Sequence, residues 1–239
     1  MGEVRLGPKA TLQLAQISRD WKQGQHVLIT GGTGSGKTRL ARELDEIRVK
    51  RGGHVVVFVC KLRPDETIKE AYSGFTRWTR WQKPKMTDTR ILLWPAVEGL
   101  PQREAVKLMW DTFAHALSEI SRVGRWTVHI DEGLFFTSPR YLNFGKELGM
   151  MYQLMRTSKA TMITLAQRPA HLPLEIYANV DYAFIGRANE VMDMKRLANL
   201  DGNLSSKQLA ALINSNGKHD FTYVPIALGK PPERINLAE

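Results

Sequence analysis

The sequence predicts an α/β protein whose sheet is mainly parallel and covered by helices on both faces. Short apolar runs rich in β-branched residues alternate with segments of helical spacing along the 239 residues. The run within 54–60 is continuously apolar, as expected for a strand buried on both faces of a sheet. In 102–121, apolar side chains recur at i, i+3, i+4 and i+7 and form one stripe. Strands that alternate with such helices indicate parallel pairing.

The predicted elements follow one another regularly from the amino terminus. We expect a lead-in, 1–24, with a short helix, then one domain, 25–228, and a polar tail, 229–239. The expected strands are 26–30, 54–60, 90–94, 126–130, 161–166, 182–186 and 221–228, the last as a strand or hairpin arm. The expected helices are 38–50, 102–121, 141–157 and 204–214. The basic and aromatic segment 73–89 interrupts this alternation.

The composition indicates a soluble, cytoplasmic protein with a polyanionic partner. No apolar run approaches the roughly 20 residues that cross a bilayer, and the first ten residues lack a signal-peptide core. The one cysteine, Cys60, can form no internal disulfide, which suits a reducing compartment, and we expect it to be buried. A net charge of +10 points to nucleic acid or an anionic membrane surface, and we expect nucleic acid and no membrane.

A glycine-rich segment follows the first predicted strand and opens the first long helix. It reads Gly31-Gly32-Thr33-Gly34-Ser35-Gly36-Lys37-Thr38, which matches G-x-x-x-x-G-K-[ST] in full. Glycines let the backbone curl so that several N–H groups point at one phosphate, and the helix adds its positive end. Lys37 is expected on the β- and γ-phosphates and the Thr38 hydroxyl on Mg²⁺. The motif therefore predicts a P-loop that binds ATP with Mg²⁺.

Two adjacent carboxylates follow the predicted strand 126–130. Asp131 should hold Mg²⁺ through water, and Glu132 stands where a general base polarises the attacking water. The strand 161–166 also ends in a polar side chain, Gln167, which can sense the γ-phosphate or orient the water. His129 lies inside its strand, and we expect it to be a core residue.

A resemblance to the FtsK–HerA superfamily of DNA-pumping ATPases is carried by Leu165-Ala166-Gln167-Arg168-Pro169, which is similar to the ATQRP signature of that family. Arg156 lies 11 residues before Gln167, where those translocases carry an arginine at a helix end. Two runs, 176–180 and 183–187, are similar to the family's IKANIPTRIAFR stretch. The resemblance covers roughly 25–200.

The resemblance implies a RecA-like (ASCE) core whose sensor strand lies between the P-loop strand and the Asp-Glu strand. It implies a homo-oligomeric ring, a pentamer or hexamer, with ATP at subunit interfaces and double-stranded DNA through the centre without sequence preference. An arginine from the neighbouring subunit then completes each site. Arg156 is our candidate for that arginine, with Arg168 and Arg187 as competitors.

The resemblance narrows further when the flanking segments are compared. Chromosome-segregating members carry a membrane-spanning segment and a winged helix, and HerA-type members carry a β-barrel, whereas 1–24 is too short for such a domain. The chain thus resembles the genome-packaging ATPases of double-stranded DNA viruses and phages. We expect a packaging motor that docks on a viral portal or capsid vertex, in the host cytoplasm or at the virion vertex.

Two other functions stay open, and so does the role of one surface segment. A protein-export or phage-extrusion ATPase shares much of this core, and a small-molecule kinase fits the chain length, although a kinase does not need Glu132 or Gln167. In 73–90, five basic residues are interleaved with Phe75, Trp78 and Trp81. This segment either contacts DNA or is a connector whose aromatic residues pack onto the core or a neighbouring subunit.

Overall fold

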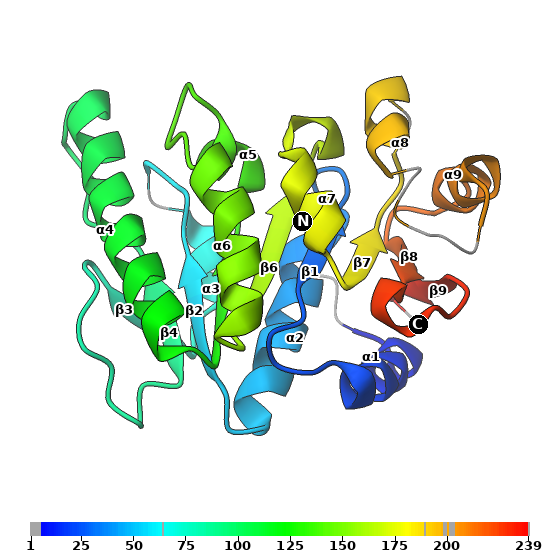
Figure 1. Cartoon of the computed structure of the whole chain (residues 1–239), viewed down its shortest axis with the longest axis horizontal. Coiled ribbons are helices and arrows are strands. Elements are labelled where there is room, and N and C mark those ends of the chain that lie inside the picture. The colour runs from blue at the N-terminus through cyan, green and yellow to red at the C-terminus, as the bar shows by residue number, and fades with distance from the viewer. Residues whose placement is uncertain (1–5, 64, 189, 198–199, 201–203, 239) are drawn as a thin grey trace.

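The computed structural model describes residues 6–63, 65–188, 190–197, 200 and 204–238. Within them, nine strands form one sheet in the order β3-β4-β2-β5-β6-β1-β7-β8-β9 (Figure 1). All pairs from β3 to β7 in that order are parallel, and β8 and β9 pair antiparallel beyond β7. The strands are β1 Val27–Thr30, β2 His54–Phe58, β3 Thr76–Trp78, β4 Arg90–Leu93, β5 Trp126–Ile130, β6 Thr161–Ala166, β7 Tyr182–Ile185, β8 Asp220–Val224 and β9 Glu233–Asn236.

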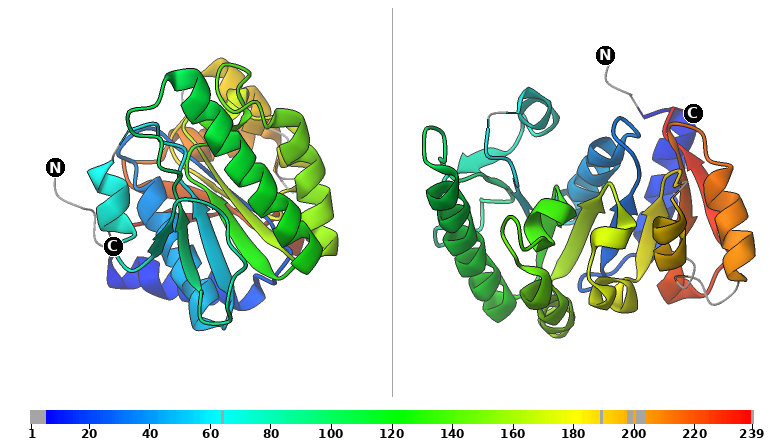
Figure 2. Two further views of the ribbon diagram at one scale, coloured as in Figure 1. Left: turned by 90° about the vertical axis from the view of Figure 1, so that its left-hand side faces the viewer. Right: turned by 90° about the horizontal axis from the view of Figure 1, so that it is seen from above.

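Helices cover both faces of the sheet, as the alternation of elements predicts (Figure 2). Along β2, Val56 and Phe58 pack in the core under α4 and α6, whereas Val55 and Val57 pack on the opposite face with residues of α3. A second core on that opposite face joins α1 and α2 to β1. The α-helices are α1 Pro8–Asp20, α2 Lys37–Lys50, α3 Glu66–Ala71, α4 Gln102–Val123, α5 Gly133–Thr137, α6 Gly145–Thr157, α7 Leu174–Asn179, α8 Val191–Leu197 and α9 Ser206–Asn214. Two 3₁₀ turns are η1 Pro169–His171 and η2 Ile226–Leu228.

The order of the central strands confirms the predicted core. β6, the sensor strand, lies between β5 and β1, with Thr164 opposite Ile130 and Ala166 opposite Thr30. Because the three strands are parallel, the residues that follow them meet at one edge of the sheet. We call this the carboxyl edge, and the opposite one, where the parallel strands begin, the amino edge.

Both terminal segments belong to the fold. The lead-in contains α1, and Trp21 after it stacks under the buried Arg48 guanidinium, whose carbon lies 3.5 Å from the ring centroid. Burial lowers the pKa of Arg48 to about 9. The segment expected to be a polar tail forms β9 instead, because the alternating Ile235 and Leu237 are fully buried against β8 and the α1–α2 core.

The segment 73–90 is fastened to the core by its aromatic residues. Phe75, Trp78 and Trp81 are each 8% exposed, and Trp81 packs edge-on against Trp126 with ring centroids 5.5 Å apart. The aromatic residues are therefore anchors and do not form a contact surface. Arg77 pairs with Glu98 and Arg90 with Glu46, which leaves three exposed basic residues of the segment, Arg80, Lys83 and Lys85.

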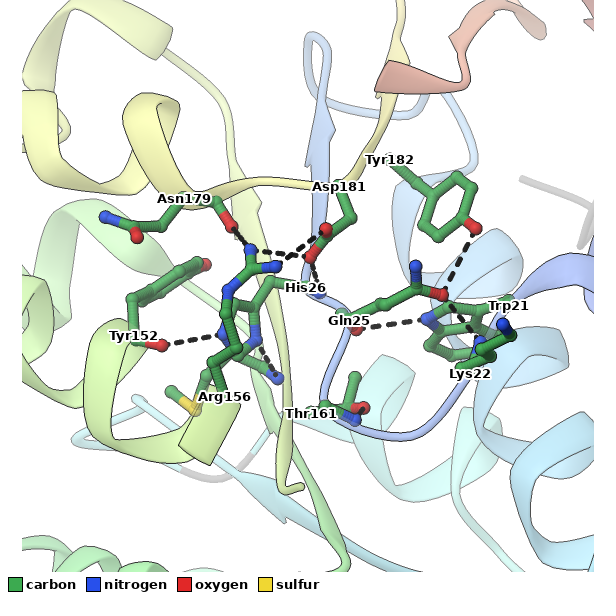
Figure 3. A network of polar contacts seen from close by, with 12 residues as sticks. Trp21, Lys22, Gln25, His26, Tyr152, Arg156, Thr161, Asn179, Asp181 and Tyr182 are labelled. Atoms are coloured by element: carbon green, nitrogen blue, oxygen red, sulfur yellow. Dashed lines mark hydrogen bonds and ion pairs between the residues drawn. The ribbon is translucent and has the colours of Figure 1, made fainter. Parts of the chain in front are cut away.

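The amino edge is held by a polar network of the buried His26 and Asp181 with the partly exposed Arg156 (Figure 3). The His26 backbone N–H donates to Asp181 Oδ2 at 2.7 Å. The Met162 N–H donates to His26 Nδ1 at 3.0 Å, so Nε2 carries the proton and donates to the Tyr152 carbonyl at 2.7 Å. Arg156 donates to both carboxylate oxygens of Asp181, at 3.1 and 2.9 Å. The network ties the beginnings of β1, β6 and β7 to the end of α6.

The neutral His26 ring should make stability depend on pH. Burial lowers its pKa from 6.5 to about 4, so the unfolded chain binds this proton first as the pH falls. The free energy of unfolding should therefore decrease from pH 6.5 to pH 4, by up to about 3 kcal/mol from this group. Chemical denaturation at several pH values measures it.

His26→Gln is the matched variant, because its amide offers one donor and one acceptor and does not titrate in this range. The difference in unfolding free energy between the native protein and this variant should shrink towards pH 4. Parallel pH profiles for the two proteins would contradict the assignment.

Candidate active site

The P-loop curls directly after β1, and α2 begins at Lys37. Gly34 and Gly36 have φ of 73° and 99°, a region that side chains other than glycine rarely adopt. A Cβ on Gly36 would also lie 2.8 Å from the side chain of Leu237, which follows β9, so this side chain would have to shift to admit one. The 14-residue helix α2 points its amino terminus into this loop, which makes the loop an anion site.

Lys37 lies over the loop that precedes it. Its ammonium donates to the carbonyls of Gly31 at 2.7 Å and Gly32 at 2.9 Å. Burial lowers the pKa of Lys37 to about 8, the nearby Glu132 acts in the opposite sense, and Lys61 adds to the decrease. The structure thus places Lys37 beside the candidate base and within the curl of the phosphate loop.

Asp131 is fixed by one oxygen and unpartnered at the other. Its Oδ1 accepts from the Cys60 N–H at 2.7 Å, and its buried Oδ2 has no partner among the described residues. Burial raises the pKa of Asp131 to about 6, against the Cys60 N–H and the charge of Lys61. A buried carboxylate oxygen without a donor, together with the Thr38 hydroxyl, suits a hard cation such as Mg²⁺. Thr38 and Asp131 are the residues that would hold this ion.

Glu132 is linked to the P-loop through Gln167. The Gln167 amide donates to Glu132 Oε2 at 3.1 Å, and its Oε1 accepts from the Thr33 hydroxyl at 3.2 Å. Gly133 permits this approach, since a Cβ there would lie 2.9 Å from the Leu165 carbonyl and 2.8 Å from the Leu172 side chain. The chain Thr33–Gln167–Glu132 therefore joins the residues that follow β1, β6 and β5.

Three buried polar atoms around this loop have no partner within the described part of the chain. They are Ser35 Oγ, Asp131 Oδ2 and Glu132 Oε1. Buried polar atoms are almost always hydrogen-bonded. Other described residues, such as Asp45 and Arg48, also hold an unpartnered buried atom, but these three border the loop and suit a site that receives polar groups. The amino edge shows the opposite state, because the His26–Asp181–Arg156 network is internally paired.

The three candidate arginines lie in different places. Arg156 is at the amino edge, so it is not part of the P-loop site of its own chain. Arg168 follows Gln167 but pairs with Asp193 at 2.8 Å. Arg187 follows β7 at the carboxyl edge and is exposed. The expectation that Arg156 is a finger therefore requires a second copy of the chain.

Some residues near the site carried no signal in the sequence. Lys61 follows β2, and its charge acts on both Asp131 and Lys37. Lys218 and His219 come from the turn between α9 and β8 and reach the P-loop. Their approach depends on the antiparallel strands beyond β7, which no local pattern reveals. His129 is a core residue, as expected, and its Nδ1 lies 2.8 Å from the buried Asp45 carboxylate.

Comparison with solved structures identifies the fold. The DNA-packaging ATPase B204 from Sulfolobus turreted icosahedral virus aligns with a TM-score of 0.62 at 14% identity, over 90% of this chain and 98% of that one. The genome-packaging NTPase B204 from Sulfolobus turreted icosahedral virus 2, in complex with AMPPCP, aligns with a TM-score of 0.59 at 12% identity, over 88% and 96%. The chain has a RecA-like P-loop NTPase fold.

Other comparisons agree with this fold. VirB4 of Thermoanaerobacter pseudethanolicus aligns with a TM-score of 0.62 at 11% identity, over 89% of this chain and 88% of that one. At 11–14% identity these alignments show a likeness in fold, which agrees with the expected P-loop NTPase core. The family model of the Sigma-54 interaction domain matches residues 7–78, which include the P-loop. No curated protein sequence matches the chain.

None of the helices in the described residues has the length and apolar character needed to cross a membrane.

Replacing Glu132 by glutamine should separate nucleotide binding from hydrolysis. The amide keeps the shape and the contact to Gln167 but cannot accept a proton, so turnover should fall about 10²–10⁴-fold. Binding of Mg-ATP, measured by calorimetry, should be retained. Lys37→Ala should lose ATP hydrolysis and should also bind Mg-ATP more weakly.

Glu104→Gln is the matched control, since Glu104 is exposed on the first turn of α4. It should hydrolyse ATP as the native protein does. Undiminished turnover in Glu132→Gln would show that another group is the base.

Proposed function

We propose that the chain is an ATP-hydrolysing motor that translocates double-stranded DNA and packages a viral genome. The observation that carries the hydrolytic part is the Thr33–Gln167–Glu132 chain, which ties a carboxylate to the phosphate loop. The partly paired Asp131 beside it supports a metal-assisted reaction. Likeness in fold to the packaging ATPase B204 supports the choice of motor.

Each site residue has a role in this proposal. The N–H groups of 31–36 and the amino end of α2 bind the phosphates, and Lys37 neutralises the β- and γ-phosphates. Thr38 and Asp131 would hold Mg²⁺, which would supply positive charge against the negative charge that develops on the phosphoryl oxygens. Glu132 accepts a proton from the attacking water, and Gln167 keeps Glu132 in position.

The second carboxylate favours hydrolysis over phosphoryl transfer to a small molecule. In a small-molecule kinase the substrate hydroxyl is the nucleophile, so a base held beside the phosphate loop is not needed. Here Glu132 retains a buried, unpartnered Oε1 among the described residues. Since Gln167 engages Oε2, Oε1 is the oxygen of Glu132 that is left for a proton from the attacking water.

The partner in this proposal is the phosphate backbone of DNA. The net charge of +10 suits a polyanion, and the exposed Arg80, Lys83 and Lys85 lie together in one segment. A motor that moves along any sequence has no use for base-specific contacts, so phosphates are the expected targets. In a ring, each subunit would also supply Arg156 to the nucleotide site of its neighbour.

Double-stranded DNA of unrelated sequences should bind and stimulate ATP hydrolysis. Binding should weaken steeply with salt, by about 10³–10⁵ between 50 and 200 mM for six to ten phosphate contacts, because each contact releases counterions. Fluorescence anisotropy and a coupled ATPase assay measure the two effects.

A matched pair of charge variants tests the segment 73–90. Replacing Arg80, Lys83 and Lys85 by glutamine should reduce the salt slope, while the same change at the exposed Arg19, Lys22 and Lys159 should not. Hydrolysis without any response to DNA would instead favour the export or extrusion ATPase.

Arg156 should act in a neighbouring subunit. Its guanidinium is paired with Asp181 yet 46% of the side chain is exposed, so one side of it can face a partner. If it stabilises the transition state in trans, Arg156→Ala should bind ATP but lose about 10³–10⁵ in turnover. Mixing it with Lys37→Ala should restore part of the activity, because some interfaces then combine an intact loop with an intact arginine.

Asp181→Asn separates a finger from a structural ion pair. It breaks the same pair but leaves the guanidinium in place. The finger assignment requires that Asp181→Asn keeps most of the turnover. Equal losses in both variants, with no recovery on mixing, would assign Arg156 to the fold alone.

A further inference from the structure

A turn far along the chain lies against the P-loop. The turn is Gly217–Asp220, between α9 and β8, and we call it the β8 turn. The His219 Nδ1 lies 3.2 Å from the Ser35 carbonyl oxygen. A Cβ built on Gly34 would lie 4.0 Å from Lys218 Cε, and one on Gly36 would lie 4.0 Å from His219 Nδ1. The turn therefore borders the glycines that curl around the phosphates.

The β8 turn is held rigidly from several sides. Before it, the buried Asn216 side chain donates to the Ile185 carbonyl at 2.9 Å and to the Thr222 hydroxyl at 3.0 Å. Inside it, the Gly217 N–H donates to the Asp220 carboxylate at 2.8 Å. The Leu237 N–H of the C-terminal segment donates to the His219 carbonyl at 3.0 Å. A turn fastened in this way fixes where its side chains start.

Lys218 is a cation at the rim of the loop. It is exposed, and among the residues that the structure describes its ammonium has no hydrogen-bond or ion-pair partner. The Lys37 ammonium, by contrast, donates to two P-loop carbonyls. Because its Cε lies 4.0 Å from where a Cβ on Gly34 would be, the Lys218 side chain runs beside the loop, within reach of a group bound there.

We propose that Lys218 is a second phosphate-binding cation of the nucleotide site, delivered from outside the P-loop motif by the β8 turn. Its ligand is the polyphosphate of a nucleoside di- or triphosphate, and His219 positions the turn by its contact with Ser35. This rests on the proposed function, since it assumes that the loop binds nucleotide. A free, positioned ammonium beside an anion site gains a charge-assisted hydrogen bond without rearranging the loop.

Removing the positive charge of Lys218 should lower the affinity for ligands that carry a polyphosphate. Lys218→Met should weaken ADP and ATP by about tenfold, the effect of losing one hydrogen bond to a charged group. Lys218→Arg should retain most of the affinity. The loss should become smaller in high salt, because screening weakens an exposed cation. Titration calorimetry at low and high salt measures all three proteins.

Inorganic tripolyphosphate shows whether the lost contact is to phosphate. It lacks base and ribose, so Lys218→Met should weaken it by a similar factor. Lys22→Met is the matched control, since Lys22 is an exposed lysine at the amino edge, and it should bind as the native protein does. Lys218→Gln repeats the test with a polar replacement if the methionine variant folds poorly.

The outcomes distinguish a failure of the Lys218 proposal from a failure of the proposed ATPase function. If the native protein binds no nucleotide, the proposed ATPase function fails. If it binds and Lys218→Met binds equally well, Lys218 is not a phosphate ligand. A loss for ADP with none for tripolyphosphate would also overturn the proposal, because Lys218 would then contact the nucleoside.

Discussion

The adjacency of three parallel strands, β5-β6-β1, is the constraint on which the rest of the site depends. Parallel strands direct their carboxyl ends to one edge, so three distant chain segments deliver Asp131, Gln167 and the P-loop to the same place. The approach is close enough for Gln167 to contact both neighbours. Gly133 makes it possible, since any side chain there would collide with β6.

The two edges of the sheet differ in how their polar groups are satisfied. At the amino edge, His26, Asp181 and Arg156 are bound to one another and to backbone carbonyls. At the carboxyl edge, Ser35, Asp131 and Glu132 each keep a buried oxygen without a partner in the described chain. An unpaired buried polar atom costs roughly 1–3 kcal/mol, and part of this cost in the described residues falls on the candidate site, while other such atoms, for example on Asp45 and Arg48, lie elsewhere in the fold.

Local patterns were sufficient for much of the fold and for part of the site. The buried strands and long helices, the P-loop and the carboxylates after β5 follow from periodicity and motif, and the position of β6 follows from the resemblance. The short elements α3, α5, α7 and α8 carry too few residues to show a period, and the predicted helix 141–157 begins at Gly145 because a turn precedes it. Lys61, Lys218 and His219 reach the site only through long-range packing. The roles of the site residues remain predictions.

The contact of Leu237 with Gly36 has a consequence for how the chain completes its fold during synthesis. The side chain that packs on the glycine loop leaves the ribosome about 200 residues after the loop itself. β1 also forms its interstrand hydrogen bonds only after both of its neighbours, β6 and β7, have been synthesised. Loop-closure entropy makes such distant pairings slow to form. A nascent chain therefore carries the phosphate motif long before the loop has its full packing, and a ligand of the loop stabilises the fold only after the segment that holds Leu237 has been made.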